Sequence, residues 1–178
     1  MVTWPATTKR RRQQPEYDAQ VRLFVLINWL MQLHPDRAGD LEDVWATPSG
    51  GKRPAGEAGR MKASGQRKGV PDVECAVPAH GHPGLFIEMK SPTGRLTPEQ
   101  RDRMARLDAR GYQTAVCRSW TEAGHVLCDY LDLPWPRDAE TQVEARLCLQ
   151  HATSRGVTWW PRLPAAHHPF NSHAGETP

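Results

Sequence analysis

Two short apolar segments, joined by a turn-forming connection, constrain the fold of this chain most strongly. The segments 72–77 and 85–90 are each the length of a strand and are rich in apolar residues. The connection between them, 78–84, contains two prolines and two glycines. Such a connection between two apolar runs predicts an antiparallel hairpin.

Three charged side chains come together on this hairpin. Side chains alternate between faces along a strand, so Glu88 and Lys90 share one face, and the hairpin brings Asp72 beside Glu88. Two carboxylates at one point repel each other unless a cation lies between them, and such oxygen ligands suit Mg²⁺. Lys90 would then orient or help to deprotonate a water and neutralise charge on a phosphate. The pattern indicates metal-dependent phosphodiester hydrolysis.

The hairpin leaves two alternatives open. The charged residues also suit a solvated strand face with an ordinary cross-strand ion pair. A further carboxylate, Glu74, shares the face of Asp72 and is a second candidate for its role. We favour Asp72, because the tight Gly69-Val70-Pro71 entry fixes its position.

Positive charge is concentrated ahead of the hairpin. The net charge of the 178-residue chain is only +3, but the glycine-rich stretch from 52 to 68 has a single acidic residue among its cations: Lys52, Arg53, Arg60, Lys62, Arg67 and Lys68. A basic stretch that leads into a carboxylate strand is typical of a track for a phosphate backbone. A mobile, solvated loop is the alternative.

The remaining signals predict an α/β domain. We expect helices at 15–33, 60–63, 98–110, 120–131 and 138–152, and further strands at 43–47 and 112–117. Thr97 and Gln100 are spaced as a capping box, as are Ser119 and Glu122. The helix that precedes strand 112–117 makes this strand a parallel and buried one.

The four cysteines and the polar start suggest an intracellular protein. Cys75 and Cys117 lie in predicted strands, and no Cys-x-x-Cys pair occurs. The longest apolar run, 23–31, is too short to span a bilayer. We therefore expect a soluble intracellular protein, with no membrane partner and no nucleotide cofactor. The scattered histidines are interpreted as surface residues.

Several blocks in one order resemble the PD-(D/E)xK nuclease core, and more narrowly the short stand-alone VRR-NUC (virus-type replication-repair nuclease) family. The resemblance covers 15–133 and leaves a basic tail, 1–14, and a C-terminal extension, 134–178. It rests on Glu16 and Gln20, on Pro48-Ser49-Gly50-Gly51-Lys52-Arg53, on Lys62, on Gly69-Val70-Pro71-Asp72, on 84–90, on 94–100 and on Gly111-Tyr112.

The resemblance implies a restriction-endonuclease-like fold, a mixed sheet flanked by helices in αβββαβα order. It implies a Mg²⁺- or Mn²⁺-dependent endonuclease that acts as a homodimer on branched DNA, above all four-way junctions, in the bacterial or phage-infected cytoplasm. The implied metal ligands are Asp72, Glu88, the Met89 carbonyl and Glu16, and the implied catalytic lysine is Lys90. Gln100 would position substrate or water, while the local pattern uses the same side chain as a cap partner, and the choice between the two roles stays open.

Two other functions remain open at this point. A non-catalytic DNA-binding or packaging accessory protein would need only the basic stretch, and a flap or nicking nuclease would act as a monomer. The wide apolar stripe of helix 15–33 offers a surface for a dimer, although the core could use the same residues.

Overall fold

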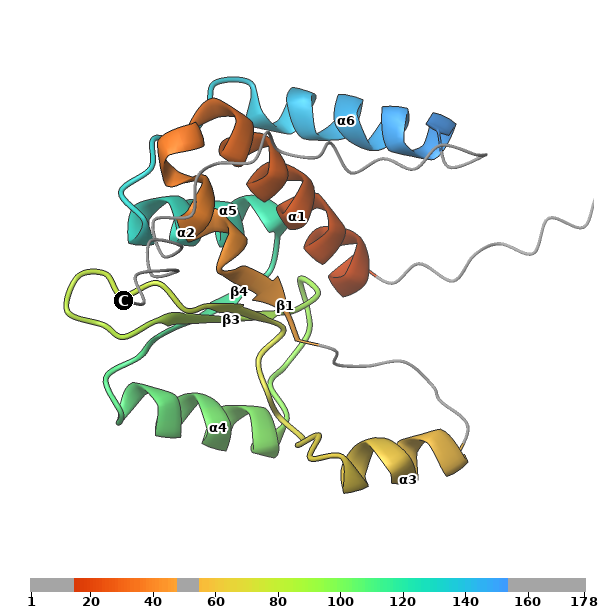
Figure 1. The fold of residues 1–178 in the computed structure, drawn as a ribbon. Helices are drawn as coiled ribbons and strands as arrows, with labels where there is room; N and C mark the ends of the chain where they lie inside the picture. Colours follow the sequence, from red (N-terminus) through yellow and green to blue (C-terminus); the bar gives the residue numbers. More distant parts are fainter. Residues whose placement is uncertain (1–14, 48–54, 154–178) are drawn as a thin grey trace, which may run out of the picture.

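The computed structural model describes residues 15–47 and 55–153 as helices, strands and connections (Figure 1). The helices are α1 (Pro15–Leu33), the 3-10 helix η1 (Pro35–Arg37), α2 (Ala38–Glu42), α3 (Ala55–Ala63), α4 (Pro98–Asp108), α5 (Trp120–Tyr130) and α6 (Ala139–Thr153). The strands are β1 (Val44–Ala46), β2 (Val73–Cys75), β3 (Leu85–Met89) and β4 (Gln113–Cys117). All the predicted elements are confirmed in kind; α3 begins earlier than expected.

The four strands form one mixed sheet in the order β1-β2-β3-β4. The β2–β3 hairpin is antiparallel, with Val73 opposite Ile87, as predicted. The β4 strand is parallel to β3, also as predicted. The prediction that β4 is buried is wrong for most of its length, because it lies at the end of the sheet and only Cys117 is buried.

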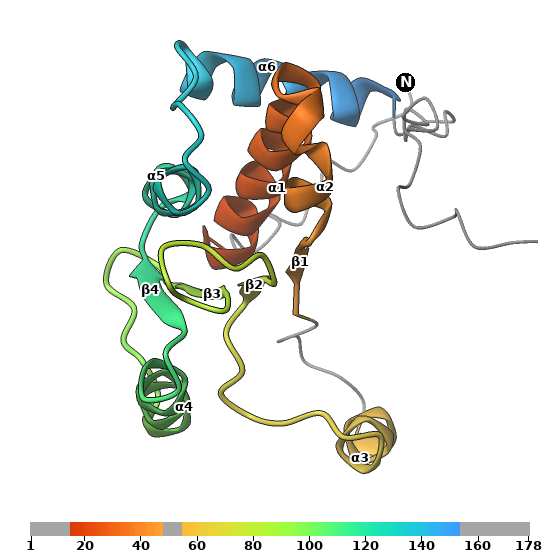
Figure 2. The same ribbon diagram turned by 60° about the vertical axis from the view of Figure 1, so that its left-hand side comes forward.

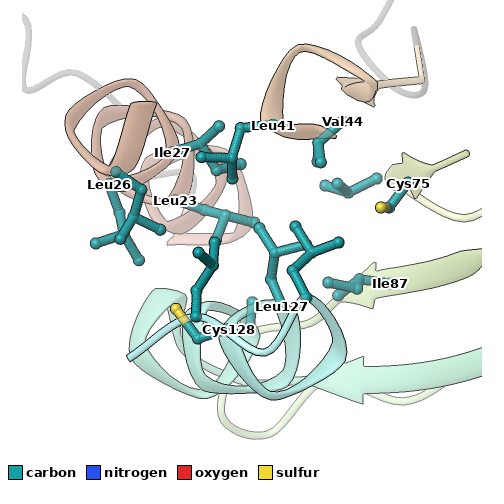
Figure 3. Close-up of a cluster of buried hydrophobic side chains, with 14 of the residues drawn as sticks. Leu23, Leu26, Ile27, Leu41, Val44, Cys75, Ile87, Leu127 and Cys128 are labelled. Atoms are coloured by element: carbon teal, nitrogen blue, oxygen red, sulfur yellow. The ribbon is translucent and has the colours of Figure 1, made fainter. Parts of the chain in front are cut away.

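The helices form layers on both faces of this sheet. Helices α1, α2, α5 and α6 lie on one side, and α4 lies on the other (Figures 1 and 2). The core fills the space between α1, α5 and the first face, where buried side chains from helices and strands meet (Figure 3): Leu23, Leu26, Ile27, Leu41, Val44, Cys75, Ile87, Leu127 and Cys128. The alternate strand residues therefore face α4.

Helix α6 covers the apolar stripe of α1. Val143 and Leu147 are buried in the same core cluster as the α1 side chains. Arg22 of α1 pairs with Glu144 at 2.5 Å. The stripe is thus used within the chain, so it no longer supports a dimer. Leu149 is 66% exposed, because it falls on the far side of the helix from Leu147.

The capping predictions are confirmed for α4 and corrected for α5. At α4 both reciprocal hydrogen bonds of the capping box form between Thr97 and Gln100. At α5 the Ser119 hydroxyl accepts from the Glu122 N–H, but the Glu122 carboxylate accepts from Arg118 N–H instead of closing on Ser119. Among the described residues, no helix is long and apolar enough to cross a membrane.

The architecture is the mixed α/β fold that the sequence predicts. The αβββαβα order is present, with η1 and α2 added after α1, α3 placed between β1 and β2, and α6 appended at the end. Cys75, Cys117 and Cys128 are free and buried, and Cys148 is free and exposed.

Candidate active site

The hairpin places Asp72 directly beside Glu88. The β2–β3 register, extended by one residue, puts these two opposite each other on the α4 face. The Asp72 Oδ2 atom accepts a hydrogen bond from the Met89 N–H at 2.9 Å. The Asp72 carboxylate therefore continues the hydrogen bonding of β3 where the β2 strand itself begins, and this contact fixes it against β3.

Glu88 lies at the centre of the site and has no exposed surface. Its Oε1 atom accepts from Lys90 Nζ at 2.7 Å and from Gln100 Nε2 at 2.5 Å. Its Oε2 atom is buried and has no hydrogen-bond partner among the described residues. One carboxylate oxygen is thus held by two donors, while the other is left without a donor.

The surroundings of Glu88 favour its neutral form. Burial raises its pKa from the ordinary value of 4.5 to about 7, and the nearby Asp72 carboxylate contributes to the rise. The hydrogen bond and positive charge of Lys90 act in the opposite direction. A cation at this point would favour the charged form of both carboxylates.

Gln100 contacts the site and caps the helix at the same time. Its Oε1 atom accepts from the Thr97 N–H at 2.9 Å, and its Nε2 atom donates to Glu88. The cap and the contact with Glu88 therefore do not exclude each other, because the two ends of one amide serve them separately. The role of Gln100 toward substrate or water stays a prediction.

A glycine fixes the approach to Asp72. Gly69 has φ +71°, and a Cβ atom there would lie 2.5 Å from the Glu99 carbonyl oxygen. The loop before Asp72 thus packs directly on the first turn of α4, next to Gln100. This contact joins the two segments that supply the site.

Glu16 reaches the end of β3 from the start of α1. Its Oε1 atom accepts from the Ser91 N–H at 3.0 Å, one residue beyond Lys90. The predicted neighbourhood of Glu16 and the hairpin is present, although the contact that forms is to the main chain.

The donor set fits a hard divalent cation with few protein ligands. The unpartnered Glu88 Oε2 and the adjacent Asp72 supply two carboxylates. The Met89 N–H points toward Asp72, and in a strand the carbonyl of the same residue points to the same side. Within residues 15–47 and 55–153, no three His, Cys, Asp or Glu side chains gather as a metal cage. A cation here would keep several waters, as Mg²⁺ does.

The histidines near the hairpin have structural contacts. His82 Nδ1 lies 2.7 Å from the Gly111 carbonyl oxygen, and His80 Nε2 lies 3.4 Å from Asp132. They brace the loop between β2 and β3, away from the carboxylates.

The basic stretch is only partly described. Arg60, Lys62, Arg67 and Lys68 are exposed on α3 and on the loop that leads to Asp72. Lys52 and Arg53 lie outside the described residues. Hydrogen bonds to its own main-chain N–H and to Thr97 lower the pKa of Glu99 at the start of α4, and the positive charge of Lys68 adds a smaller effect in the same direction. Lys68 therefore lies near this end of the site.

Sequence reasoning missed Thr47. Its N–H donates to the Asp72 carbonyl oxygen at 2.8 Å, and its hydroxyl is buried with no hydrogen-bond partner in the described part of the chain. Thr47 thus belongs to the same row of the sheet as Asp72 and Glu88. Only the β1–β2 register shows this, because nothing in the local sequence links Thr47 to Asp72.

Comparisons with known proteins agree with this geometry. Residues 48–120 match the model of the VRR-NUC domain family. A solved structure of a VRR_NUC domain protein resembles this chain with a TM-score of 0.52 and 22% sequence identity, covering 69% of this chain and 93% of that chain. At this identity the likeness shows the fold. No curated protein matches the chain.

Proposed function

We propose that this chain is a Mg²⁺- or Mn²⁺-dependent endonuclease of branched DNA, because residues 48–120 match the VRR-NUC domain family, which implies a nuclease that acts on DNA. Four-way junctions are the proposed substrate. The observation that carries the metal dependence is the buried Glu88 carboxylate, whose Oε2 atom has no donor among the described residues and lies beside Asp72.

The proposal includes four protein ligands for the metal. Asp72, Glu88 and the Met89 carbonyl would hold it, and Glu16 would act directly or through a water. When bound, the metal supplies an activated water and polarises the phosphate oxygens.

The other side chains proposed for the site would orient the metal ligands and the attacking water and would neutralise the charge of the DNA phosphates. Lys90 and Gln100 hold the Glu88 Oε1 atom, so that Oε2 keeps one orientation. The Lys90 ammonium is paired directly with Glu88, where it would orient the attacking water and offset charge on the phosphate. The exposed Arg60, Lys62, Arg67 and Lys68, together with Lys52 and Arg53, would bind the flanking backbone.

The site favours an enzyme over a DNA-binding accessory protein. A protein that only binds DNA gains nothing from two carboxylates facing phosphate, and burial of Glu88 with a raised pKa costs stability. A flap or nicking nuclease acting as a monomer is the second candidate. The packing of α6 on the apolar stripe of α1 supports this candidate, because that stripe is then not free to form a dimer.

A homodimer remains part of the proposal for junctions. Resolution of a four-way junction requires two symmetric cuts, and this chain has one Asp72–Glu88–Lys90 site. The dimer surface would then lie elsewhere than on α1. Light scattering of the protein with and without junction DNA measures this directly.

A substrate panel tests the proposal. End-labelled duplex, single-stranded, flap and four-way DNA are incubated with Mg²⁺, Mn²⁺ or EDTA. We expect cleavage of the branched forms with either metal, symmetric cuts in the junction, and none in EDTA. Equal cleavage of all four forms would rule out structure selectivity, and cuts in one junction strand by a monomer would favour the flap or nicking enzyme.

A further inference from the structure

The face of the sheet that carries the two carboxylates also carries an exposed tryptophan, Trp45. It belongs to the neighbouring set of residues that lie opposite one another across the strands. The register pairs Trp45 of β1 with Glu74 of β2, and Glu74 with Phe86 of β3. This row lies beside the row of Asp72 and Glu88, two residues along each strand, or about 6–7 Å. Val44 points into the core, so Trp45 points to the face that carries the site.

Trp45 leaves part of its indole accessible on this face. The residue is 41% exposed. Phe86, the aromatic residue of the same row, packs edge-on against Tyr112, with ring centroids 5.2 Å apart. Within the described residues, Trp45 makes no ring stacking or cation–π contact.

Glu74 decides what kind of group can lie against Trp45. It is half-buried between the two aromatic positions, opposite Trp45 on one side and Phe86 on the other. A carboxyl group here disfavours a phosphate. It can instead accept a hydrogen bond from an amino group on the edge of a nucleobase, as Glu and Asp do with cytosine N4. The surface formed by Trp45 and Glu74 therefore favours a nucleobase over the phosphate backbone of DNA.

We propose that Trp45 and Glu74 form a subsite that holds one unpaired nucleobase of the strand being cut. The base stacks on the indole of Trp45, and an exocyclic amino group of the base donates to Glu74. This inference rests on the proposed nuclease function. It deepens that function by linking branch selectivity to a base that is free to leave the stack, since a paired base cannot reach the indole.

Fluorescence of 2-aminopurine tests the subsite without any cleavage. The probe is placed at successive positions in the single-stranded arm of a flap DNA, with EDTA present. We expect the wild-type protein to quench one or two positions, Trp45→Phe to retain part of the quenching, and Trp45→Leu to lose it. Leu33→Ala, which changes an exposed apolar residue at the far end of α1, should quench like the wild type.

Cleavage adds a second readout. Trp45→Leu should cut the flap roughly tenfold more slowly at subsaturating DNA, because stacking of one base on an aromatic side chain contributes on the order of 1–3 kcal/mol. At the quenched position, cytosine should bind better than thymine, and Glu74→Gln should remove this preference.

The outcomes separate the subsite from the enzyme. Quenching by the wild type with no cleavage of any DNA would keep the base subsite and overturn the nuclease. Quenching and cleavage by Trp45→Leu at wild-type levels, or an equal loss in Leu33→Ala, would overturn the subsite and leave the nuclease intact. An unchanged cytosine preference in Glu74→Gln would overturn the role of its carboxyl group.

Discussion

The Gln100 side chain connects the start of α4 to Glu88: its carbonyl oxygen accepts from the Thr97 N–H, and its amide nitrogen donates to Glu88 Oε1. Only one orientation of the amide satisfies both contacts, because the flipped amide would point its oxygen at the Glu88 carboxylate, where no hydrogen bond can form. The helix cap therefore sets the direction of the donor that reaches Glu88.

Gln100→Glu should separate the cap from the site. Glutamate at this position keeps a capping box, so the helix should stay folded, but it places a third carboxylate against Glu88. We expect a loss of cleavage of at least tenfold at saturating DNA, with a far-UV circular dichroism spectrum like that of the wild type.

Thr97→Ala is the matched control for the cap. It removes the hydroxyl acceptor and should lower the free energy of unfolding by about 1 kcal/mol, while cleavage remains near the wild-type rate. The linkage between cap and site would be contradicted if Gln100→Glu cleaved normally.

The stability of the metal-free protein should depend on Glu88 and pH. The folded-state pKa of about 7 lies above the unfolded value near 4.5, so the folded protein binds the proton more tightly. The stabilisation of the folded state by the proton on Glu88 is fully present below pH 4.5 and is lost as the pH rises to about 7. The loss is on the order of 3 kcal/mol.

Glu88→Gln removes this titration. In EDTA the variant should gain stability relative to the wild type between pH 4.5 and 7, as measured by urea unfolding. Glu42→Gln, at an exposed position, should show no such change. A constant difference between wild type and Glu88→Gln across this range would mean that Glu88 titrates normally.

Lys90→Ala should destabilise the protein as well as inactivate it. The solvated strand face that the sequence left open is wrong for two of the three residues, because Glu88 and Lys90 are buried and paired at 2.7 Å. Removal of one partner leaves a buried carboxylate uncompensated, at a cost of about 3–5 kcal/mol. Thermal unfolding at pH 8 measures this loss.

A double-mutant cycle isolates the pair. In a Glu88→Gln background, Lys90→Ala should cost far less, because no charge remains to be compensated. Equal losses in both backgrounds would show that Lys90 stabilises the fold by packing alone.

The exposed cations should set the salt dependence of DNA binding. Glutamine substitutions at Arg60, Lys62, Arg67 and Lys68 should weaken binding regardless of sequence. For every phosphate that a substitution leaves without its cation, the slope of log K against log salt should fall by about 0.9. Fluorescence anisotropy between 50 and 200 mM salt, roughly the range in which such cations act, provides the slope.

An exposed arginine of α4 gives a control for charge alone. Arg106→Gln should leave the slope nearly unchanged, since this side chain is already paired with Asp102. If the slope of log K against log salt is the same in the wild type and in the variant with all four glutamine substitutions, the basic stretch does not contact phosphate.

Local sequence signals predicted the elements well because they act over a few residues. The hairpin follows from two apolar runs and a proline- and glycine-rich connection, and the α4 start follows from the spacing of Thr97 and Gln100. The same alternation placed Glu88 and Lys90 on one face. These features require no knowledge of the rest of the chain.

Features that depend on distant segments could not be read in advance. The burial of Glu88 arises from packing of α4 on the sheet, and the use of the α1 stripe arises from α6, more than a hundred residues later. The dual contacts of Gln100 need the helix and strand to be placed together. The positions of Thr47 and Trp45 follow from the β1–β2 register, which no local pattern fixes.

The central claim is that the Asp72–Glu88–Lys90 site cuts DNA with a divalent metal, and cleavage of a labelled four-way junction by wild type and Glu88→Gln tests it most directly. Glutamine keeps the shape and leaves the fold intact, but it removes the charge that would hold the metal. We predict cutting by the wild type in Mg²⁺ and none in EDTA, with a loss of at least a hundredfold, about 3 kcal/mol, in Glu88→Gln. Cleavage by Glu88→Gln at the wild-type rate, or metal-independent cleavage by the wild type, would contradict the account.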